Sequence, residues 1–324
     1  MVFSLPPLLA LGYQERLKNH LTLFLEAYRR KGKVPALIAR FRGLAYPLSF
    51  LRMLGKPSLL SAYPLRFMLP NLWRLGLQPW TGDSLPLLLI GVYQYARLTG
   101  DGSLLEAYRV EIGELTDALA SKVEEEGLLP GSGWMDAMAN YLGKPTLTCQ
   151  LLAYEALKLS GKLSQASTLK SLIRENYWNE EGFYTDLPGS TRMDSLANAL
   201  AAIYGVASNN SFLGEIVRRF SEFKGLPNIY PPYPRRVCGQ KPYTYQNAAL
   251  WPFIQGYLVA ALVKAGLREE AAEAFRRLIS LPGLNEWYTV EGEPRGSPNQ
   301  LWTAAQIFHA YRALGGSLQE ENLV

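Results

Sequence analysis

The strongest constraint on the fold of this chain is a repeat of paired helices. A helical period of 3.6 residues recurs along the sequence, whereas the alternating pattern of strands is nearly absent. Later in the chain, mostly apolar segments alternate with segments that carry charge on one face. The apolar segments begin near residues 84, 146, 192, 247 and 299, which indicates a unit of about 50 residues. Such pairs bury their apolar faces by stacking, so the pattern predicts a closed toroid or an open solenoid.

About a dozen helices are expected in total. They span 14–31, 34–54, 58–76, 84–99, 103–126, 146–160, 163–178, 192–207, 210–223, 247–265, 267–280 and 299–314. The links between pairs are long and hold most of the tryptophan, tyrosine, glycine and proline; they cover 127–145, 179–191, 224–246 and 281–298. Loops of this length in a compact domain are usually functional. Because each one leads into an apolar helix, all should open at one end of the fold, beside helix N-termini.

These aromatic loops favour a closed barrel over an open solenoid. We expect an all-α fold, an (α/α)6 toroid with six inner helices ringed by six outer ones and a pocket where the long loops converge. An armadillo-like solenoid would show the same alternation, but solenoids do not usually concentrate aromatic loops along one rim. The whole chain, 1–324, is predicted to be one catalytic domain. Whether residues 1–79 complete the barrel or partly form an interface stays open.

The composition excludes several classes of protein. The content of 48% hydrophobic and 19% charged residues is typical of a globular domain. The longest apolar run, 85–92, is far shorter than the roughly 20 residues that cross a bilayer, and residues 1–11 lack the features of a signal peptide. We therefore predict a cytoplasmic protein without a membrane partner. The net charge of +5 is dispersed among acidic residues, which argues against a nucleic-acid partner.

Few residues are available to hold a metal. Cys149 and Cys238 are the only cysteines, and His20 and His309 are the only histidines. This count excludes a structural zinc site and any mechanism that needs several imidazoles, so no metal and no cofactor is expected. His309 lies ten residues beyond Asn299 along the last helix, about 15 Å from the mouth of the pocket, which argues against a catalytic role.

Two loop carboxylates, each beside a tryptophan, point to glycoside hydrolysis. Asp136 follows Trp134 in the first long loop, and Glu286 precedes Trp287 in the last. In this chemistry one acid protonates the leaving oxygen while the other activates water on the opposite face of the sugar. Asp136 could instead cap the next helix, but Pro145 places the start of that helix too far downstream. Glu286 could instead be a solvated residue paired with an arginine.

Several loop-to-helix junctions carry further motifs. The segments are Thr81-Gly82-Asp83-Ser84; Trp134-Met135-Asp136-Ala137 with Gly143-Lys144-Pro145; Arg192-Met193-Asp194-Ser195; Tyr245-Gln246-Asn247 with Trp251-Pro252; and Glu286-Trp287-Tyr288 with Gln300-Leu301-Trp302-Thr303. Together they resemble the six-hairpin (α/α)6-barrel glycosidases, especially the glucosidase domain of glycogen debranching enzymes. The resemblance extends more distantly to neutral invertases, trehalases and mannosylglycerate hydrolases. It covers about residues 80–314.

The resemblance implies an inverting hydrolase of a small α-glucoside or related oligosaccharide, in which Asp136 is the general acid and Glu286 the general base. The residues that it implies in substrate binding are Trp80, Asp83, Trp134, Lys144, Arg192, Asp194, Tyr245, Gln246, Asn247, Trp251, Trp287, Gln300 and Trp302. This chain departs from many relatives in having Leu147-Thr148 in place of a carboxylate and Gln246 in place of a histidine. These departures leave the sugar and the aglycone open.

Alternative interpretations remain for individual residues and for the whole chain. Asp83 and Asp194 stand where helix caps are common, and Trp251 could be a core residue. Basic residues in the loops, such as Arg192, would suit an anionic substrate such as a glycosylglycerate. A sugar epimerase would need imidazole bases, which are scarce here. A non-catalytic helical scaffold that binds a partner is the remaining alternative, and a homo-oligomer is compatible with the sequence.

Overall fold

The structure is a computed structural model of the 324-residue chain and describes residues 2–34 and 82–316. The helices predicted over 34–54 and 58–76 fall on residues 35–81, outside the described residues. Trp80 lies outside them too. The other predicted helices fall within the two described ranges.

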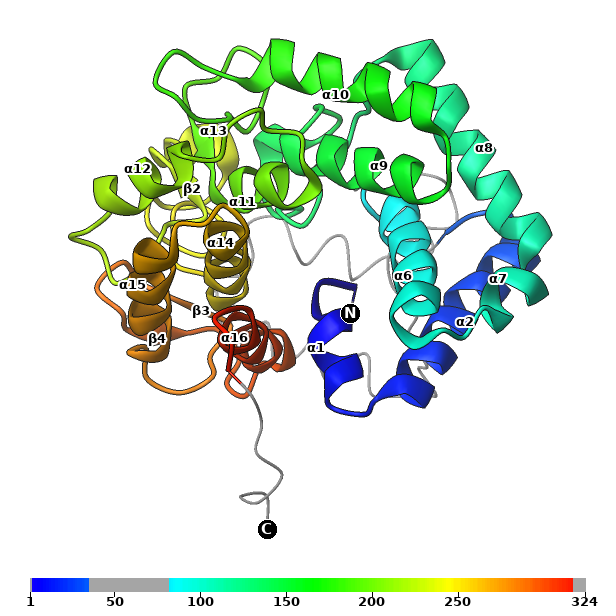
Figure 1. Cartoon of the computed structure of the whole chain (residues 1–324). Helices are drawn as coiled ribbons and strands as arrows, with labels where there is room; N and C mark the ends of the chain where they lie inside the picture. The colour runs from blue at the N-terminus through cyan, green and yellow to red at the C-terminus, as the bar shows by residue number, and fades with distance from the viewer. Residues whose placement is uncertain (1, 35–81, 317–324) are drawn as a thin grey trace, which may run out of the picture.

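Six helices form a closed inner ring (Figure 1). They are α1 (Leu5–Ala10), α6 (Ser84–Thr99), α9 (Leu147–Leu159), α11 (Ser195–Tyr204), α14 (Pro252–Lys264) and α16 (Leu301–Ala313). Each contacts the next around the ring, and α1 closes the circle between α16 and α6. The predicted barrel is thus confirmed, and an open solenoid is excluded. The sixth inner helix, α1, was not among the predicted helices.

The outer layer wraps this ring. In the described part of the chain it consists of α2 (Gln14–Lys31), α7 (Ser103–Ala107), α8 (Arg109–Glu126), α10 (Leu163–Tyr177), α12 (Phe212–Arg219) and α15 (Arg268–Ile279). The single helix predicted over 103–126 is wrong in one respect, because it is interrupted at Tyr108. The ring of Tyr108 packs against the guanidinium of Arg29 in α2, 4.4 Å away, so the interruption falls where the two outer helices meet.

Burial separates the two layers as the hydrophobic patterns predicted. In α9 every side chain from Leu147 to Leu157 is buried, because the helix is covered on all sides. In α10 only Ala166, Leu169, Ile173 and Tyr177 are buried; they recur every three or four residues and form one face. Each fully buried leucine contributes about 1.5–3 kcal/mol to stability.

One glycine sets the distance between two inner helices. A Cβ atom on Gly256 of α14 would lie 2.6 Å from the Cβ of Gln306 and 2.7 Å from its carbonyl oxygen. Both are shorter than a van der Waals contact, so any larger residue would push α14 and α16 apart. The small residue therefore fixes the spacing of the ring beside the last helix.

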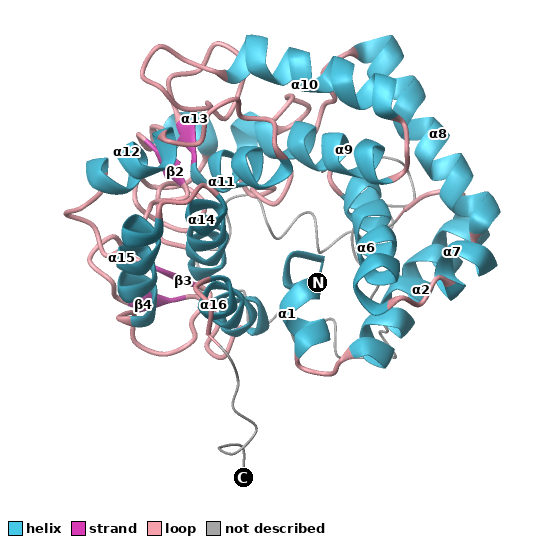
Figure 2. Ribbon diagram, in the orientation of Figure 1, coloured by secondary structure: helices cyan, strands magenta, loops and turns pink. Residues whose placement is uncertain are grey.

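The two ends of the barrel differ. Long loops lead into the N-termini of the inner helices at one end, which we call the loop end; short turns follow their C-termini at the other, the turn end. The loops hold the short strands of the described residues, which pair antiparallel (Figure 2): β1 (Met193–Asp194) with β2 (Ile229–Tyr230), and β3 (Trp287–Tyr288) with β4 (Pro294–Arg295). They also hold η3 (Ala139–Tyr141) and α13 (Arg235–Cys238), whereas η1 (Val2–Ser4) precedes α1.

Candidate active site

Aromatic rings from three separate loops and from inner helix α16 meet at the loop end. The centroid of Trp251 lies 5.2 Å from that of Trp134, 5.2 Å from Tyr245 and 5.6 Å from Trp302. Tyr245 in turn lies 6.2 Å from Trp287. The sequence predicted all five of these residues as site residues, and the structure brings them together. Trp251 is almost completely buried and contacts three of the other four rings; these four are half-buried.

The side chain of Gln246, from another loop, positions the segment that carries Asp136. Gln246 accepts a hydrogen bond from the backbone N–H of Ala137 (2.9 Å) and donates to the carbonyl of Trp134 (2.8 Å). Its amide nitrogen also reaches Oδ1 of Asp136 at 3.4 Å. Gln246 thereby fixes the backbone on both sides of the carboxylate, which itself is half-buried.

Glu286 is held by the hairpin of β3 and β4. Its backbone N–H donates to the carbonyl of Ser297 (2.9 Å), and its Oε2 accepts from the N–H of the same residue (3.1 Å). Gly296 has φ +71°, and a Cβ atom there would lie 2.5 Å from Oε2 of Glu286. Only glycine allows this approach, because a side chain would displace the half-buried carboxylate.

One segment, 245–251, joins the loops that carry the two acids. At its start Gln246 contacts Asp136, and the ring of the preceding residue, Tyr245, contacts Trp287 beside Glu286. At its end Leu250 exchanges two backbone hydrogen bonds with Tyr288, of 2.8 and 2.9 Å. The first and last long loops therefore meet on a common support, although they are far apart in sequence.

Three of the predicted substrate-binding residues are closed off from solvent. Asp194 caps α11 by accepting from the N–H of Ala197 (3.0 Å), and its other oxygen accepts from Thr148 (2.8 Å). Burial raises the pKa of its carboxyl to about 7. Asn247 is fully buried and exchanges hydrogen bonds with the backbone of Tyr233 (2.8 and 2.9 Å). With Trp251, these residues are buried and hold the loops in this structure; their role in substrate binding stays a prediction.

The remaining predicted residues lie around this centre. Asp83 is nearly buried before α6, and its side chain does not cap that helix, contrary to the capping alternative. Its loop is close to the loop of Asp136, because a Cβ on Gly82 would lie 2.8 Å from the Cα of Gly131. Lys144 is exposed, and Gln300 is half-buried before α16.

Arg192 is a half-buried residue among those predicted, and it comes from the second long loop. Its guanidinium lies 4.0 Å from the ring centroid of Tyr233. Its Nε is buried and has no hydrogen-bond partner. A buried N–H donor without an acceptor lowers the stability of the fold, unless a ligand or a water molecule accepts its hydrogen bond.

A buried cluster that the sequence did not predict ties three long loops together. Asp186 accepts hydrogen bonds from the hydroxyls of Tyr141 and Tyr233, both at 2.6 Å, and from the N–H of Leu187 at 2.9 Å. The carboxyl is fully buried, and this burial raises its pKa. The only signal in the sequence was the concentration of tyrosine in these loops, because Asp186 stands before a proline and a glycine and looks like a turn residue.

Within the residues that the structure describes, no three histidine, cysteine, aspartate or glutamate side chains lie close enough together to hold a metal ion. No helix in that part of the chain is both long and apolar enough to cross a membrane.

No family description and no curated protein matches the sequence, but solved structures match the fold. A glycosidase in its wild-type form has 16% identity and a TM-score of 0.57, over 94% of this chain and 80% of that one. A variant glycosidase in complex with glucose has 14% identity and a TM-score of 0.56, with the same coverage. A GH63 mannosylglycerate hydrolase from Thermus thermophilus, solved with Tris and D-glycerate, has 18% identity and a TM-score of 0.43; this chain covers 45% of its length.

The likenesses to the two glycosidase structures show the architecture. The chain has the fold of the six-hairpin (α/α)6-barrel glycosidases. Its aromatic centre and its two loop carboxylates are features of this chain's own sequence and structure.

Proposed function

We propose that the chain is an inverting glycoside hydrolase that acts on a small α-glucoside or a related oligosaccharide. The observation that carries the proposal is the arrangement of Asp136 and Glu286. Both are half-buried, both come from long loops at the same end of the barrel, and both loops are tied to segment 245–251. The glycosidase fold of the solved neighbours supports the same class of reaction.

In this mechanism Asp136 donates its proton to the glycosidic oxygen as the bond to the anomeric carbon breaks. Glu286 takes a proton from a water molecule, which attacks the anomeric carbon from the opposite face. The products are an alcohol and a sugar of inverted configuration; Asp136 is left as a carboxylate and Glu286 carries a proton. Oε2 of Glu286 accepts from Ser297, so this contact orients the group that activates water.

The walls of the pocket suit a sugar ring. Trp134, Tyr245, Trp287 and Trp302 supply flat, half-buried surfaces for the apolar faces of the ring. The indole N–H groups of Trp134 and Trp302 are buried without a partner, and a sugar hydroxyl could accept from either. Asp83 and Gln300 are proposed as additional contacts, and Lys144 as a contact at the exposed rim.

A second candidate is a hydrolase of an anionic glycoside such as a glycosylglycerate. The specific observation in its favour is Arg192, whose Nε is buried without a partner while its guanidinium lies on Tyr233. Guanidinium groups bind carboxylates in a bidentate manner. This candidate differs from the first in the aglycone and shares its two acids.

The test is incubation with a panel of α- and β-linked disaccharides and glycosylglycerates, with the product anomers followed by NMR. We expect an α-glucoside to release the β-anomer first. Cleavage of glycosylglycerates alone would favour the second candidate. Release of the retained anomer would contradict the inverting mechanism, and sugar binding without cleavage of any member would favour a non-catalytic binding protein.

A further inference from the structure

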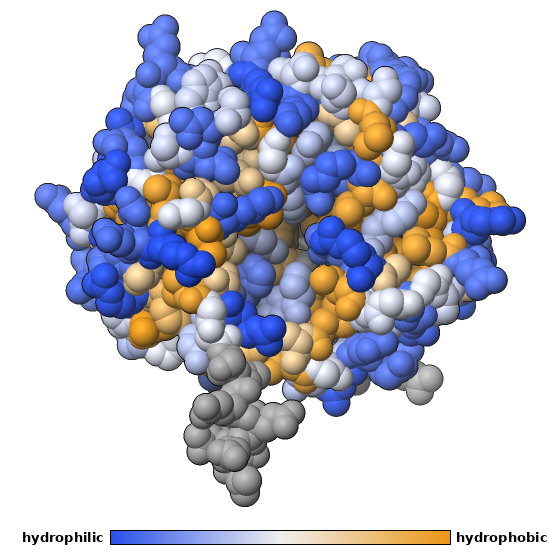
Figure 3. Space-filling view, viewed as in Figure 1, coloured by the Kyte–Doolittle hydropathy of each residue, from blue (hydrophilic) through white to orange (hydrophobic). Residues whose placement is uncertain are grey.

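A cavity lies at the turn end of the barrel, away from the loops that carry Asp136 and Glu286. Its volume is about 240 Å³, and it is lined by residues of five inner helices, α1, α6, α11, α14 and α16, together with Phe3 before α1. The molecule is hollowed at the centre of the ring in Figure 3. His309, which the sequence placed far from the pocket mouth, lies in this wall.

One residue that lines the cavity, Gln306, carries a buried hydrogen-bond acceptor without a partner. Gln306 is 1% exposed, and its amide nitrogen donates to the carbonyl of Phe3, which also accepts from the hydroxyl of Tyr257 (3.1 Å). The other amide atom, Oε1, has no partner. A buried acceptor without a donor destabilises the fold, so a ligand that donates a hydrogen bond here would remove that cost.

Apart from Lys264, the other polar groups in the wall are neutral. Gln94 and Tyr204 lie beside the same space. Burial lowers the pKa of His309, so its imidazole is uncharged at neutral pH. The ammonium of Lys264 donates to the carbonyl of Ile203, and this side chain is exposed. The interior therefore offers hydrogen bonds and ring surfaces but no buried charge to bind an ion.

We propose that this cavity is a second ligand site, which takes a neutral polyhydroxylated molecule no larger than a monosaccharide. A ligand hydroxyl donates to Oε1 of Gln306, and Gln94, Tyr204 and His309 offer further donors and acceptors. The size limit follows from the volume, which is below the range of about 300–1,000 Å³ typical of pockets for drug-sized ligands.

Phe3 separates this site from the candidate active site. Its ring centroid lies 6.0 Å from that of Phe253, and Phe253 stacks on Trp302 at 4.8 Å. Phe3 also lines the cavity. The two sites therefore lie on opposite sides of one layer of aromatic rings, and the second does not depend on the proposed catalytic function.

The test measures how many probe molecules bind per chain, with glucose and glycerol as probes, by calorimetry and by soaking crystals. Wild-type protein should bind glucose in the turn-end cavity, next to Gln306. Ala260→Leu narrows the cavity and His309→Phe removes a polar group; each should weaken this binding at least tenfold while glycoside turnover at the loop end stays unchanged. A third variant, Gln306→Leu, removes the acceptor.

The outcomes decide the proposal directly. Loss of one bound probe in Ala260→Leu, with unchanged melting temperature, supports it. Equal probe binding in wild type, Ala260→Leu and His309→Phe would overturn it, as would soaked crystals that hold only water beside Gln306. Because Ala260→Leu adds carbon atoms and removes no hydrogen bond, this variant keeps the test valid if Gln306→Leu fails to fold.

Discussion

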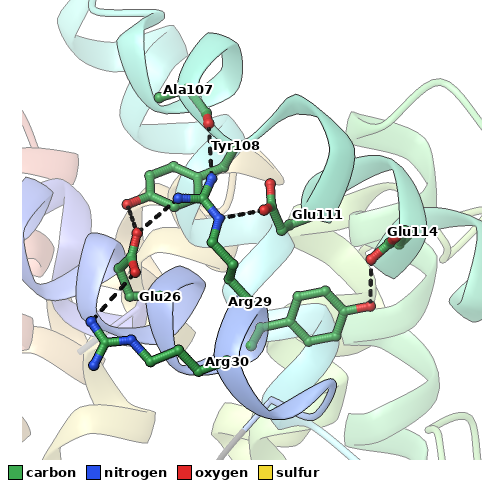
Figure 4. Close-up of polar contacts among 8 residues, drawn as sticks. Glu26, Arg29, Arg30, Ala107, Tyr108, Glu111 and Glu114 are labelled. Carbon is green, nitrogen blue, oxygen red and sulfur yellow. Dashed lines mark hydrogen bonds and ion pairs between the residues drawn. The ribbon is translucent and has the colours of Figure 1, made fainter.

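In two regions of the barrel a carboxylate accepts hydrogen bonds from tyrosine hydroxyls, but the pKa of the carboxyl is shifted in opposite directions. On the outer wall, Glu26 of α2 accepts from the hydroxyl of Tyr108 at 2.7 Å (Figure 4). At the loop end, Asp186 accepts from two tyrosine hydroxyls at 2.6 Å. The hydrogen bond from Tyr108 lowers the pKa of Glu26, whereas burial raises the pKa of Asp186 despite its hydrogen bonds. Burial, rather than the number of hydrogen bonds, therefore decides whether the pKa of the carboxyl is raised or lowered.

The surroundings of the two networks explain the difference. The outer-wall network consists of Glu26, Arg29, Tyr108 and Glu111; Arg29 donates to Glu111 at 2.5 Å and to Glu26 at 3.0 Å (Figure 4). The side chain of Arg29 is 44% exposed, so water can replace each of these contacts. Water cannot reach Asp186, and losing one of its partners would leave a buried polar group unsatisfied. Substitutions at the loop end should therefore have larger effects than substitutions on the outer wall.

The largest effect is expected for Asp136→Asn. Without a proton donor, turnover of natural glycosides should fall by roughly three orders of magnitude or more, whereas aryl glycosides with acidic leaving groups should keep more activity because they need less protonation. Steady-state kinetics on both substrate types measure this difference. Equal losses on the two types would argue against Asp136 as the acid.

Glu286→Gln should reduce turnover by about 10²–10⁴-fold with little change in substrate affinity, because the base acts on water in the transition state. The measurement is kcat together with ligand binding at equilibrium. Ser297→Ala is the matched control: it keeps the backbone N–H that Oε2 of Glu286 accepts from, and should leave kcat nearly unchanged. Trapping of a covalent glycosyl-enzyme on Glu286 would contradict inversion.

Asp186→Ala should lower the free energy of unfolding by about 3 kcal/mol, because it leaves the hydroxyls of Tyr141 and Tyr233 buried without their acceptor. Urea unfolding followed by circular dichroism measures the change. Tyr233→Phe removes a single donor and should cost about 1 kcal/mol. If Asp186→Ala costs no more than Tyr233→Phe, the cluster does not hold the loops.

Asp194→Ala should cost about 1 kcal/mol through loss of the cap on α11. Asp194→Asn keeps an oxygen that can accept from the N–H of Ala197 and removes only the titratable carboxyl. The pKa of Asp194 is about 7 in the fold against an ordinary value of 3.8, so between these values the folded chain binds a proton that the unfolded chain does not. Stability of the wild type relative to Asp194→Asn should thus fall as pH rises from about 4 to 7. A constant difference across this window would contradict a buried, neutral Asp194.

Arg29→Ala should have the smallest effect on stability, since the side chain of Arg29 is itself 44% exposed and its ion pairs lie at the surface. We expect a change close to the error of an unfolding curve at physiological salt, and none at high salt. Arg29→Lys is the control variant, because it keeps the positive charge and removes the guanidinium group. A loss as large as that of Asp186→Ala would break the comparison between the two regions.

The sequence predicted the architecture well because periodicity and composition report burial. Helix α6 occupies 84–99 as expected, and the apolar helices became the inner ring. Helix α1 was missed because it has six residues and two prolines; its place in the ring depends on contacts with α16 and α6 that no local pattern encodes. Proline is accepted there because it falls in the first turn.

The sequence predicted which residues lie at the candidate site better than it predicted which of their side chains are exposed to solvent. The aromatic residues that the sequence singled out do meet in space. Asp194 and Asn247, however, face inward and hold backbone groups. A motif fixes which residue stands at a helix start, but whether its side chain faces a pocket or the core depends on loops far away in sequence. Asp186 escaped notice for the same reason, because its two tyrosine partners come from other loops.

The closure of the ring by α1 has a consequence for how the protein folds. The first described helix packs against the last, and Phe3 accepts hydrogen bonds from Tyr257 and Gln306 near the other end of the chain. During synthesis α1 can contact α2 and α6 early, but its contact with α16 forms only after α16 has left the ribosome. Such a long-range contact is slow to form, and an unclosed ring exposes apolar helix faces that favour aggregation. Ring closure should therefore be a late step of folding, and truncation before α16 should leave α1 in contact with α2 and α6 but with the ring open.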